Sequence, residues 1–286
     1  MKKDEIAKLV KTGIDELNSA LASGHSVRMT DVLKLMARFH KYSFNNCVLI
    51  AEQFPDATRV MGFHGWKGVG RSVKKGEKGI GITAPLAVRK KDASADEMEI
   101  RGFRVVHVFD ISQTEGEELP RLAQPTGDAT QWIEPVERLI ASKGIELKYG
   151  LLDGGVCGVS SLKKIAILSG LKPPMRLEVL VHEFAHELLH SDLETRKRLS
   201  HTVMETEAQA VSHVVCQALG LEGIEHTADY IRLHQGDSGV FARSMQRIQK
   251  CASGILKELL GDKDKPVRCK ATDEEPNSDL QATLAA

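Results

Sequence analysis

The sequence predicts an α+β protein of two domains, because helical and strand-like patterns occupy different parts of the chain. Apolar residues recur at helical spacing over residues 4–22 and again in the part beyond residue 131. Between these parts, residues 59–110 combine repeated glycines with short β-branched runs, which is typical of strands joined by turns. We therefore expect an N-terminal α+β domain followed by a mainly helical domain.

The N-terminal domain, residues 1–115, is expected to begin with two helices. The first covers residues 4–22. The second runs over residues 32–54, where Pro55 ends it. Short strands follow, and the polar segment 90–99 between two of them is expected to be an exposed hairpin tip.

A linker, residues 116–130, is expected before the second domain, because it contains two prolines and no apolar periodicity. The second domain, residues 131–261, is expected to hold a long helix from Pro174 to about His190, since a proline at the first helical position loses no hydrogen bond that the helix needs. The other elements expected there are a helix near 131–143, a strand at 145–149, a strand pair within 155–169, and helices near 199–219 and 238–260. Residues 262–286 are polar and without periodicity, which predicts a disordered tail.

Composition excludes several classes of protein. Hydrophobic residues make up 42% and charged residues 27% of the 286 residues, as in ordinary globular chains. No run approaches the roughly 20 apolar residues that a membrane span needs, so we expect no membrane partner. Residues 1–17 are charged and lack the apolar core of a secretory signal. The cysteines are scattered without a CxxC pair, which indicates reduced thiols and a cytoplasmic protein.

A basic segment lies within this chain of zero net charge. Its basic residues are Arg59, Lys67, Arg71, Lys74, Lys75, Lys78, Arg89, Lys90 and Lys91, and Glu77 is the one acid among them. Such a local excess indicates a surface that faces a polyanion. A charged face that is simply solvated is the alternative.

The most specific motif is HExxH, formed by His182, Glu183 and His186 within the long helix expected from Pro174. The two histidines are one helical turn apart, so both imidazoles can hold one metal ion from the same face. Glu183 is then placed to accept a proton from a water molecule that zinc activates and to pass it to a leaving amine. The short motif also arises by chance in some chains, but its amphipathic helical setting favours a Zn²⁺ site with Glu183 as the catalytic acid–base.

A third protein ligand is required, because catalytic zinc usually has three. His190 lies one further turn along the same helix, about 6 Å away by helical rise, and is better explained as a helix-end residue. The next expected helix offers Glu205 and Glu207, as in the gluzincin arrangement. These two acids are two positions apart, so a helix points them in different directions and only one can face the zinc.

The sequence HEFAHELLH, with the ExEA element that follows it, resembles the ImmA/IrrE-type zinc peptidases and the C-terminal metallopeptidase domain of ArdC-like antirestriction proteins. This resemblance implies a zincin-like, gluzincin-type metallopeptidase domain. It also implies that Glu205 is the third ligand, with Gln209 as an outer partner and Glu207 as a surface or linking acid. The segment GVCGVSSLKKIAIL fits the edge strand beside a zincin cleft, to which an extended peptide can add. By residue type alone, the candidates for a group that stabilises the transition state are Tyr149, His213 and Tyr230.

The first domain resembles the single-stranded-DNA-binding domain of the same ArdC-like family, through RFHKYSFNNCVLI, ATRVMGFHGWKGVGRSVKKGEKGIGITAP and VFDISQTEGEELP. The resemblance implies that single-stranded DNA is a partner. Binders of this kind combine basic side chains with aromatic rings on which bases stack. The candidate DNA-binding residues are Tyr42, Trp66, Arg71, Lys74, Lys75 and Lys78. For each aromatic ring the alternative is a place in the core of the domain.

Two functions are therefore open. The first is a zinc-dependent metalloendopeptidase that cleaves an unidentified protein or peptide and binds single-stranded DNA, with an antirestriction or DNA-protection role on mobile elements. The second is a non-catalytic antirestriction protein that coats single-stranded DNA and uses its zinc for structure. The intact motif favours the enzyme, because a structural site does not need Glu183.

Overall fold

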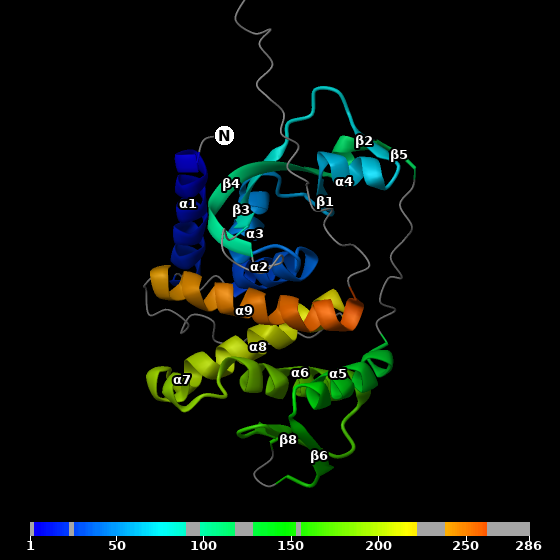
Figure 1. The fold of residues 1–286 in the computed structure, drawn as a ribbon. Coiled ribbons are helices and arrows are strands. Elements are labelled where there is room, and N and C mark those ends of the chain that lie inside the picture. Colours follow the sequence, from blue (N-terminus) through cyan, green and yellow to red (C-terminus); the bar gives the residue numbers. More distant parts are fainter. Residues whose placement is uncertain are drawn as a thin grey trace, which may run out of the picture.

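The computed structural model describes residues 3–22, 26–89, 98–117, 128–152, 156–221 and 238–261. Helices and sheets are mixed along the chain, which confirms the α+β class (Figure 1). The helices are α1 Lys3–Ala22, α2 Ser26–Arg38, α3 Phe44–Gln53, α4 Phe63–Gly68, α5 Thr130–Ser142, α6 Pro173–Leu189, α7 Leu193–Arg198, α8 His201–Ala218 and α9 Ser238–Leu260, with a 3₁₀ turn η1 at Ile111–Gln113. The strands are β1 Val60–Gly62, β2 Arg71–Val73, β3 Ile80–Arg89, β4 Met98–Asp110, β5 Thr114–Gly116, β6 Glu146–Gly150, β7 Gly158–Ser160 and β8 Lys164–Leu168. Most of the expected hairpin tip and linker, and all of the expected tail, lie outside the described residues.

The single helix expected over residues 32–54 is wrong, because the chain forms two helices there, α2 and α3. Ser43 ends the break between them: its side chain accepts a hydrogen bond from the backbone N–H of Asn46 and so caps α3. Tyr42, in the break, donates its hydroxyl to the carbonyl of Val60 at 3.1 Å. A cap and a tertiary hydrogen bond thus outweigh the helical periodicity that runs across this segment.

An antiparallel sheet of order β1-β4-β3 forms the middle of the N-terminal half. Its edge strand β3 is covered by α3, whose side-chain amides pair with the strand as a neighbouring backbone would. Asn46 bonds both the N–H and the carbonyl of Thr83, and Gln53 does the same with Gly81. The backbone N–H and carbonyl groups of Gly81 and Thr83 on this edge are therefore hydrogen-bonded within the chain. A second, smaller sheet pairs β2 with β5.

Asp110 fixes the end of β4 to two other segments. Its carboxylate accepts hydrogen bonds from the backbone N–H groups of Thr58, Arg59 and Ser112 at 2.7 to 2.9 Å, and the side chain is 1% exposed. Burial alone raises the pKa of this carboxyl, but the three N–H donors outweigh burial and hold its pKa below the ordinary value.

We expect Asp110→Asn to destabilise the fold by about 2–4 kcal/mol, because an amide replaces an acceptor oxygen and turns its own N–H toward backbone donors. Since the folded pKa is depressed, the carboxylate contributes its stabilisation above the ordinary pKa, and that contribution is lost as the pH falls through the folded value. Urea unfolding of both proteins at pH 7 and at a pH well below the ordinary value of 3.8 measures the difference, which should shrink at the lower pH. An equal difference at both pH values would contradict the role given to the ionised carboxylate.

The C-terminal half places a small mixed sheet of order β6-β8-β7 beside the long helix α6. Strand β6 pairs parallel with β8, and β7 pairs antiparallel with β8. Strand β7 is therefore an edge strand. The short helix α7, which the sequence did not predict, is capped by Asp192 and leads into α8, which packs against α6.

Helix α9 joins the two halves, since it contacts α1 and α3 of the N-terminal half and α5, α6 and α8 of the C-terminal half (Figure 1). One hydrophobic cluster contains Leu33 and Phe44 from the N-terminal half together with Val211 and Ile248 from α8 and α9. The buried amide nitrogen of Gln249 lies within hydrogen-bond distance of the carbonyl of Met36 in α2 and of the carbonyls of Phe39 and Tyr42 just after it, with Tyr42 at 3.0 Å. The two sequence halves thus share a core in addition to their separate sheets.

Within the described residues, none of the helices combines the length and the apolar character that crossing a membrane requires.

Candidate metal centre and nucleic-acid surface

Helix α6 presents His182 and His186 on one face because its other face is anchored in the core. Leu177, Leu180 and Phe184 are fully buried on that other face. The helix begins at Pro173, as a proline at the first helical position favours. The Nε2 atoms of the two histidines lie 3.1 Å apart.

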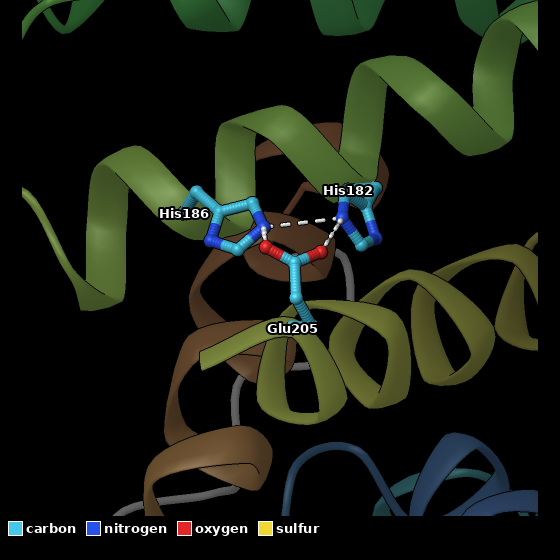
Figure 2. Close-up of side chains that lie close together, drawn as sticks. All are labelled: His182, His186 and Glu205. Atoms are coloured by element: carbon cyan, nitrogen blue, oxygen red, sulfur yellow. Dashed lines mark hydrogen bonds and ion pairs between the residues drawn. The ribbon is translucent and has the colours of Figure 1, made fainter. Parts of the chain in front are cut away.

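Helix α8 brings Glu205 opposite the two histidines, with its carboxylate between them (Figure 2). Its oxygens lie 3.4 Å from His182 Nε2 and 3.3 Å from His186 Nε2. Two ligand atoms about 2.1 Å from a tetrahedral metal ion are about 3.4 Å apart. Each histidine nitrogen stands close to this distance from the nearer oxygen of Glu205. The donor set of two imidazoles and one carboxylate fits a divalent metal ion.

Electrostatics at the three groups agree with a cation site. Hydrogen bonds with His182 and His186 hold the pKa of Glu205 far below its usual range. Burial lowers the pKa of His182, but the carboxylates of Glu205 and Glu183 outweigh burial and raise it overall. Glu205 is therefore ionised at neutral pH and supplies the negative charge that a divalent cation needs.

Glu183 lies next to this cluster and is not part of it. Its side chain is 7% exposed, and burial raises the pKa of its carboxyl against the opposing effect of both histidines and Ser160. A raised pKa brings a carboxylate closer to the range in which it exchanges protons at neutral pH. The environment of Glu183 thus suits a general base.

Strand β7 passes directly beside Glu183. A Cβ atom on Gly158 would come within 2.6 Å of Val179 Cγ1 and 2.7 Å of Glu183 Oε1, so any larger residue would have to displace these side chains of α6. The hairpin that ends β7 turns at Leu162 and Lys163, both with positive φ, and Glu187 of α6 accepts the N–H of Lys163 at 2.7 Å. The edge strand is therefore fixed to the helix that carries the histidines.

One expectation for the residues around the site is wrong in part, because Glu207 links neighbouring segments but is not at the surface. Glu207, expected to be a surface or linking acid, is 0% exposed and accepts a hydrogen bond from His190, which is 1% exposed. His190 does end α6, but its Nδ1 also lies 3.2 Å from that of His186. Gln209 lies beside His182 and bonds Glu178, which agrees with an outer partner.

The sequence did not single out His201, the first residue of α8. Its Nε2 lies 3.5 Å from Glu205 Oε1, and its side chain is largely exposed. The spacing of four residues on one helix was the available signal. Among the candidate groups for transition-state stabilisation, Tyr149 bonds Glu137, His213 is buried within α8, and Tyr230 lies outside the described residues.

The predicted lysines form an exposed basic turn. Lys74, Lys75 and Lys78 are all exposed between β2 and β3. Lys74 donates to the carbonyl of Ser112, which holds the turn against η1. We define these three lysines as the basic turn.

Two other predicted DNA contacts serve the fold. Trp66 is 0% exposed and donates its indole N–H to the carbonyl of Phe109 at 2.9 Å, so its ring packs in the interior and is not available for stacking on a base. The guanidinium of Arg71 is bonded to the Thr114 side chain and to backbone carbonyls of the 114–117 segment, where it ties β2 to β5. Tyr42 is half-buried, with its hydroxyl bonded to Val60.

Exposed aromatic rings lie elsewhere on this half. Phe63, 42% exposed, precedes Trp66 by three residues, and the ammonium of Lys67 lies 5.1 Å from the centre of its ring. Phe103, on β4, is 56% exposed. The sequence alone indicated Trp66 and not Phe63, because the burial of an aromatic ring depends on partners that are distant in the chain.

Comparison with known proteins shows similarity to one family model, one relative and two crystal structures of one protein. Residues 3–110 match the family model of the N-terminal domain of anti-restriction factor ArdC. An uncharacterized protein of Bacillus anthracis is 25% identical over 281 residues, covering 81% of this chain and 47% of that protein, so the chain spans about half the length of this relative. The antirestriction protein ArdC of plasmid R388 has a similar fold in a metal-free crystal structure, with a TM-score of 0.54, 18% identity and coverage of 88% of this chain and 98% of that one. Its Mn(II)-bound structure gives a TM-score of 0.55, 17% identity and coverage of 89% and 99%.

Proposed function

We propose that the chain, which is an ArdC-like protein, is a zinc-dependent metallopeptidase that also binds single-stranded DNA and acts in antirestriction. The observation that carries the enzymatic part is the convergence of His182, His186 and Glu205, with Glu183 buried beside them. The DNA-binding part rests on the N-terminal domain match and on the basic turn.

The three residues proposed to hold the metal are His182, His186 and Glu205. Two histidines and one carboxylate are the protein ligands of many catalytic zinc sites, and this donor set is the argument for zinc. The ArdC protein of plasmid R388, which has a similar fold, has a Mn(II)-bound crystal structure, and this supports a divalent metal ion in the present chain. When bound, the ion would act as a Lewis acid and lower the pKa of water in its open position.

Glu183 is the proposed proton carrier. It accepts a proton from the attacking water as the oxygen bonds to the peptide carbonyl carbon, and it delivers that proton to the amide nitrogen as the C–N bond breaks. The products are a carboxylic acid and an amine. Its position beside the histidines, 7% exposed and with a raised pKa, supports this role.

The edge strand β7 is the proposed docking line for an extended peptide. An edge strand offers unpaired backbone N–H and carbonyl groups to a substrate strand. Because β7 runs past Glu183 at Gly158, a peptide paired with it would lie next to the metal centre. Val159 is 47% exposed on this strand, which favours contact with apolar side chains of the substrate.

Single-stranded DNA is the proposed ligand of the N-terminal half. The basic turn supplies charge for the phosphates, and Phe63 with Lys67 supplies an exposed ring beside a cation. Phe63 and Lys67 replace Trp66 and Arg71 as proposed DNA contacts. The side chains of Trp66 and Arg71 are already hydrogen-bonded within the protein.

Protection of incoming DNA tests the proposed role. A plasmid that encodes the protein is transferred into a host with an active restriction system. The surviving transconjugants are counted for the wild type, for Glu183→Gln and for a variant in which Lys74, Lys75 and Lys78 are changed to Glu. We expect the wild type to protect and both variants to fail. Full protection by Glu183→Gln would instead support the non-catalytic function, in which the protein coats DNA and its metal is structural.

A further inference from the structure

A buried acid behind the metal centre has no part in the proposed ligand set. Glu207 is 0% exposed, and a buried carboxylate needs fixed partners. It has three: His190 at 3.0 Å on one oxygen, and the Ser244 hydroxyl and Arg247 guanidinium of α9, both on the other oxygen. The guanidinium of Arg247 carries a fixed positive charge and can only donate, so the buried carboxyl of Glu207 is paired with it as an anion.

The hydrogen bonds from Glu207 toward the metal centre can run in only one direction. An ionised carboxylate only accepts, so the Nε2 of His190 carries a proton and donates it to Glu207. A metal ion on the Nε2 of His186 requires the proton of that ring to be on Nδ1. This Nδ1 lies 3.2 Å from the Nδ1 of His190 and can donate to it only while His190 keeps its own proton on Nε2. The proton of His186 is thereby on Nδ1, and its Nε2 is left as the bare nitrogen that faces Glu205 and His182 (Figure 2).

We propose that Glu207, held by Arg247 and Ser244, is a positioning residue that acts through His190 to keep the Nε2 of His186 free for the metal ion. The inference rests on the proposed ligand set. It adds that α9, through Arg247 and Ser244, helps to orient one of the metal ligands. Partners of this outer kind typically change metal affinity by about 10–100-fold.

Glu207→Gln tests the direction of the hydrogen bonds with almost no change of shape. Arg247 and Ser244 donate to one end of the side chain, so the amide oxygen turns to them and the NH₂ group turns to His190. His190 must then accept at Nε2 and donate at Nδ1, and His186 must carry its proton on Nε2, where the metal would bind. We expect Zn²⁺ affinity, measured by competition with a chromophoric chelator, to fall about 10–100-fold.

The double variant Glu207→Gln/Arg247→Gln provides the rescue. Removing the guanidinium lets the amide of residue 207 turn its oxygen back to His190, because a glutamine at 247 can accept from the NH₂ group. We expect this double variant to regain most of the lost Zn²⁺ affinity, and Co²⁺ bound to it to regain the wild-type visible spectrum. A role in stability alone predicts a further fall in affinity, since the double variant has fewer charged contacts.

Gln249→Leu is the matched control. Gln249, on α9, is buried as Glu207 is, but its amide donates to the carbonyl of Tyr42, away from the metal centre. Thermal unfolding of all variants separates destabilisation from metal affinity. Unchanged Zn²⁺ affinity in Glu207→Gln, or an equal fall in Gln249→Leu, would overturn the inference while leaving the ligand set intact. A wild-type chain that binds no Zn²⁺ would overturn the proposed metal centre, and this inference with it.

Discussion

Glu205→Ala is expected to remove the metal ion from the protein. In the proposed site, the two histidines on one helix provide only two ligands, and the carboxylate of Glu205 would supply both the third ligand and the negative charge. The loss in Zn²⁺ affinity should be on the order of 10³-fold or more, beyond the 10–100-fold typical of an outer partner. Metal content after gel filtration, determined by mass spectrometry, should fall from one zinc per chain to nearly none.

The control for this variant is Glu194→Ala, which removes an exposed acid from α7 and should leave the metal content unchanged. Near-full metal content in Glu205→Ala would show that the third ligand is another residue. His201, which lies 3.5 Å from Glu205, would then be the first alternative to test.

Charge reversal of the basic turn is expected to abolish most of the affinity for single-stranded DNA. With Lys74, Lys75 and Lys78 all changed to Glu, attraction to phosphates is replaced by repulsion, because all three side chains are exposed. Removal of one phosphate-binding lysine lowers the slope of log affinity against log salt by about 0.7, so we expect a slope smaller by about 2 and an affinity at low salt reduced on the order of 10²-fold.

Fluorescence anisotropy of a labelled oligonucleotide over a series of salt concentrations measures both quantities. The matched control changes Lys143, Lys164 and Lys172 to Glu, since these lysines are also exposed but lie in the C-terminal half. Equal reductions in affinity in the two triple variants would mean that net charge alone is responsible and that the basic turn is not the binding surface.

The sequence predicted those features that local patterns determine. Helix α6 follows from Pro173 and the apolar spacing before the motif, and its two histidines face the same way because they are four residues apart. Glu205 could not be separated from Glu207 by spacing alone, and only the family resemblance favoured it. The structure supplies the physical difference, since Glu205 faces the histidines while Glu207 is buried toward α9.

The features that were missed depend on interactions between distant segments. The burial of Trp66 requires the carbonyl of Phe109, and the environment of Glu207 requires Arg247 of α9. The break between α2 and α3 is likewise stabilised by a hydrogen bond from Tyr42 to Val60. None of these pairs follows from periodicity or from a short motif, because their partners meet only in the folded chain.

The central claim, that the metal centre hydrolyses peptide bonds through Glu183, is tested most directly by mapping new protein N-termini in cells. The wild type and Glu183→Gln are expressed at equal levels, with and without single-stranded DNA, and the N-terminal peptides are quantified by mass spectrometry. Both chains should contain equal amounts of zinc, because Glu183 is not a proposed ligand. We expect a set of new N-termini that appears only with the wild type. Identical N-terminal peptides from the two proteins under both conditions would contradict the claim.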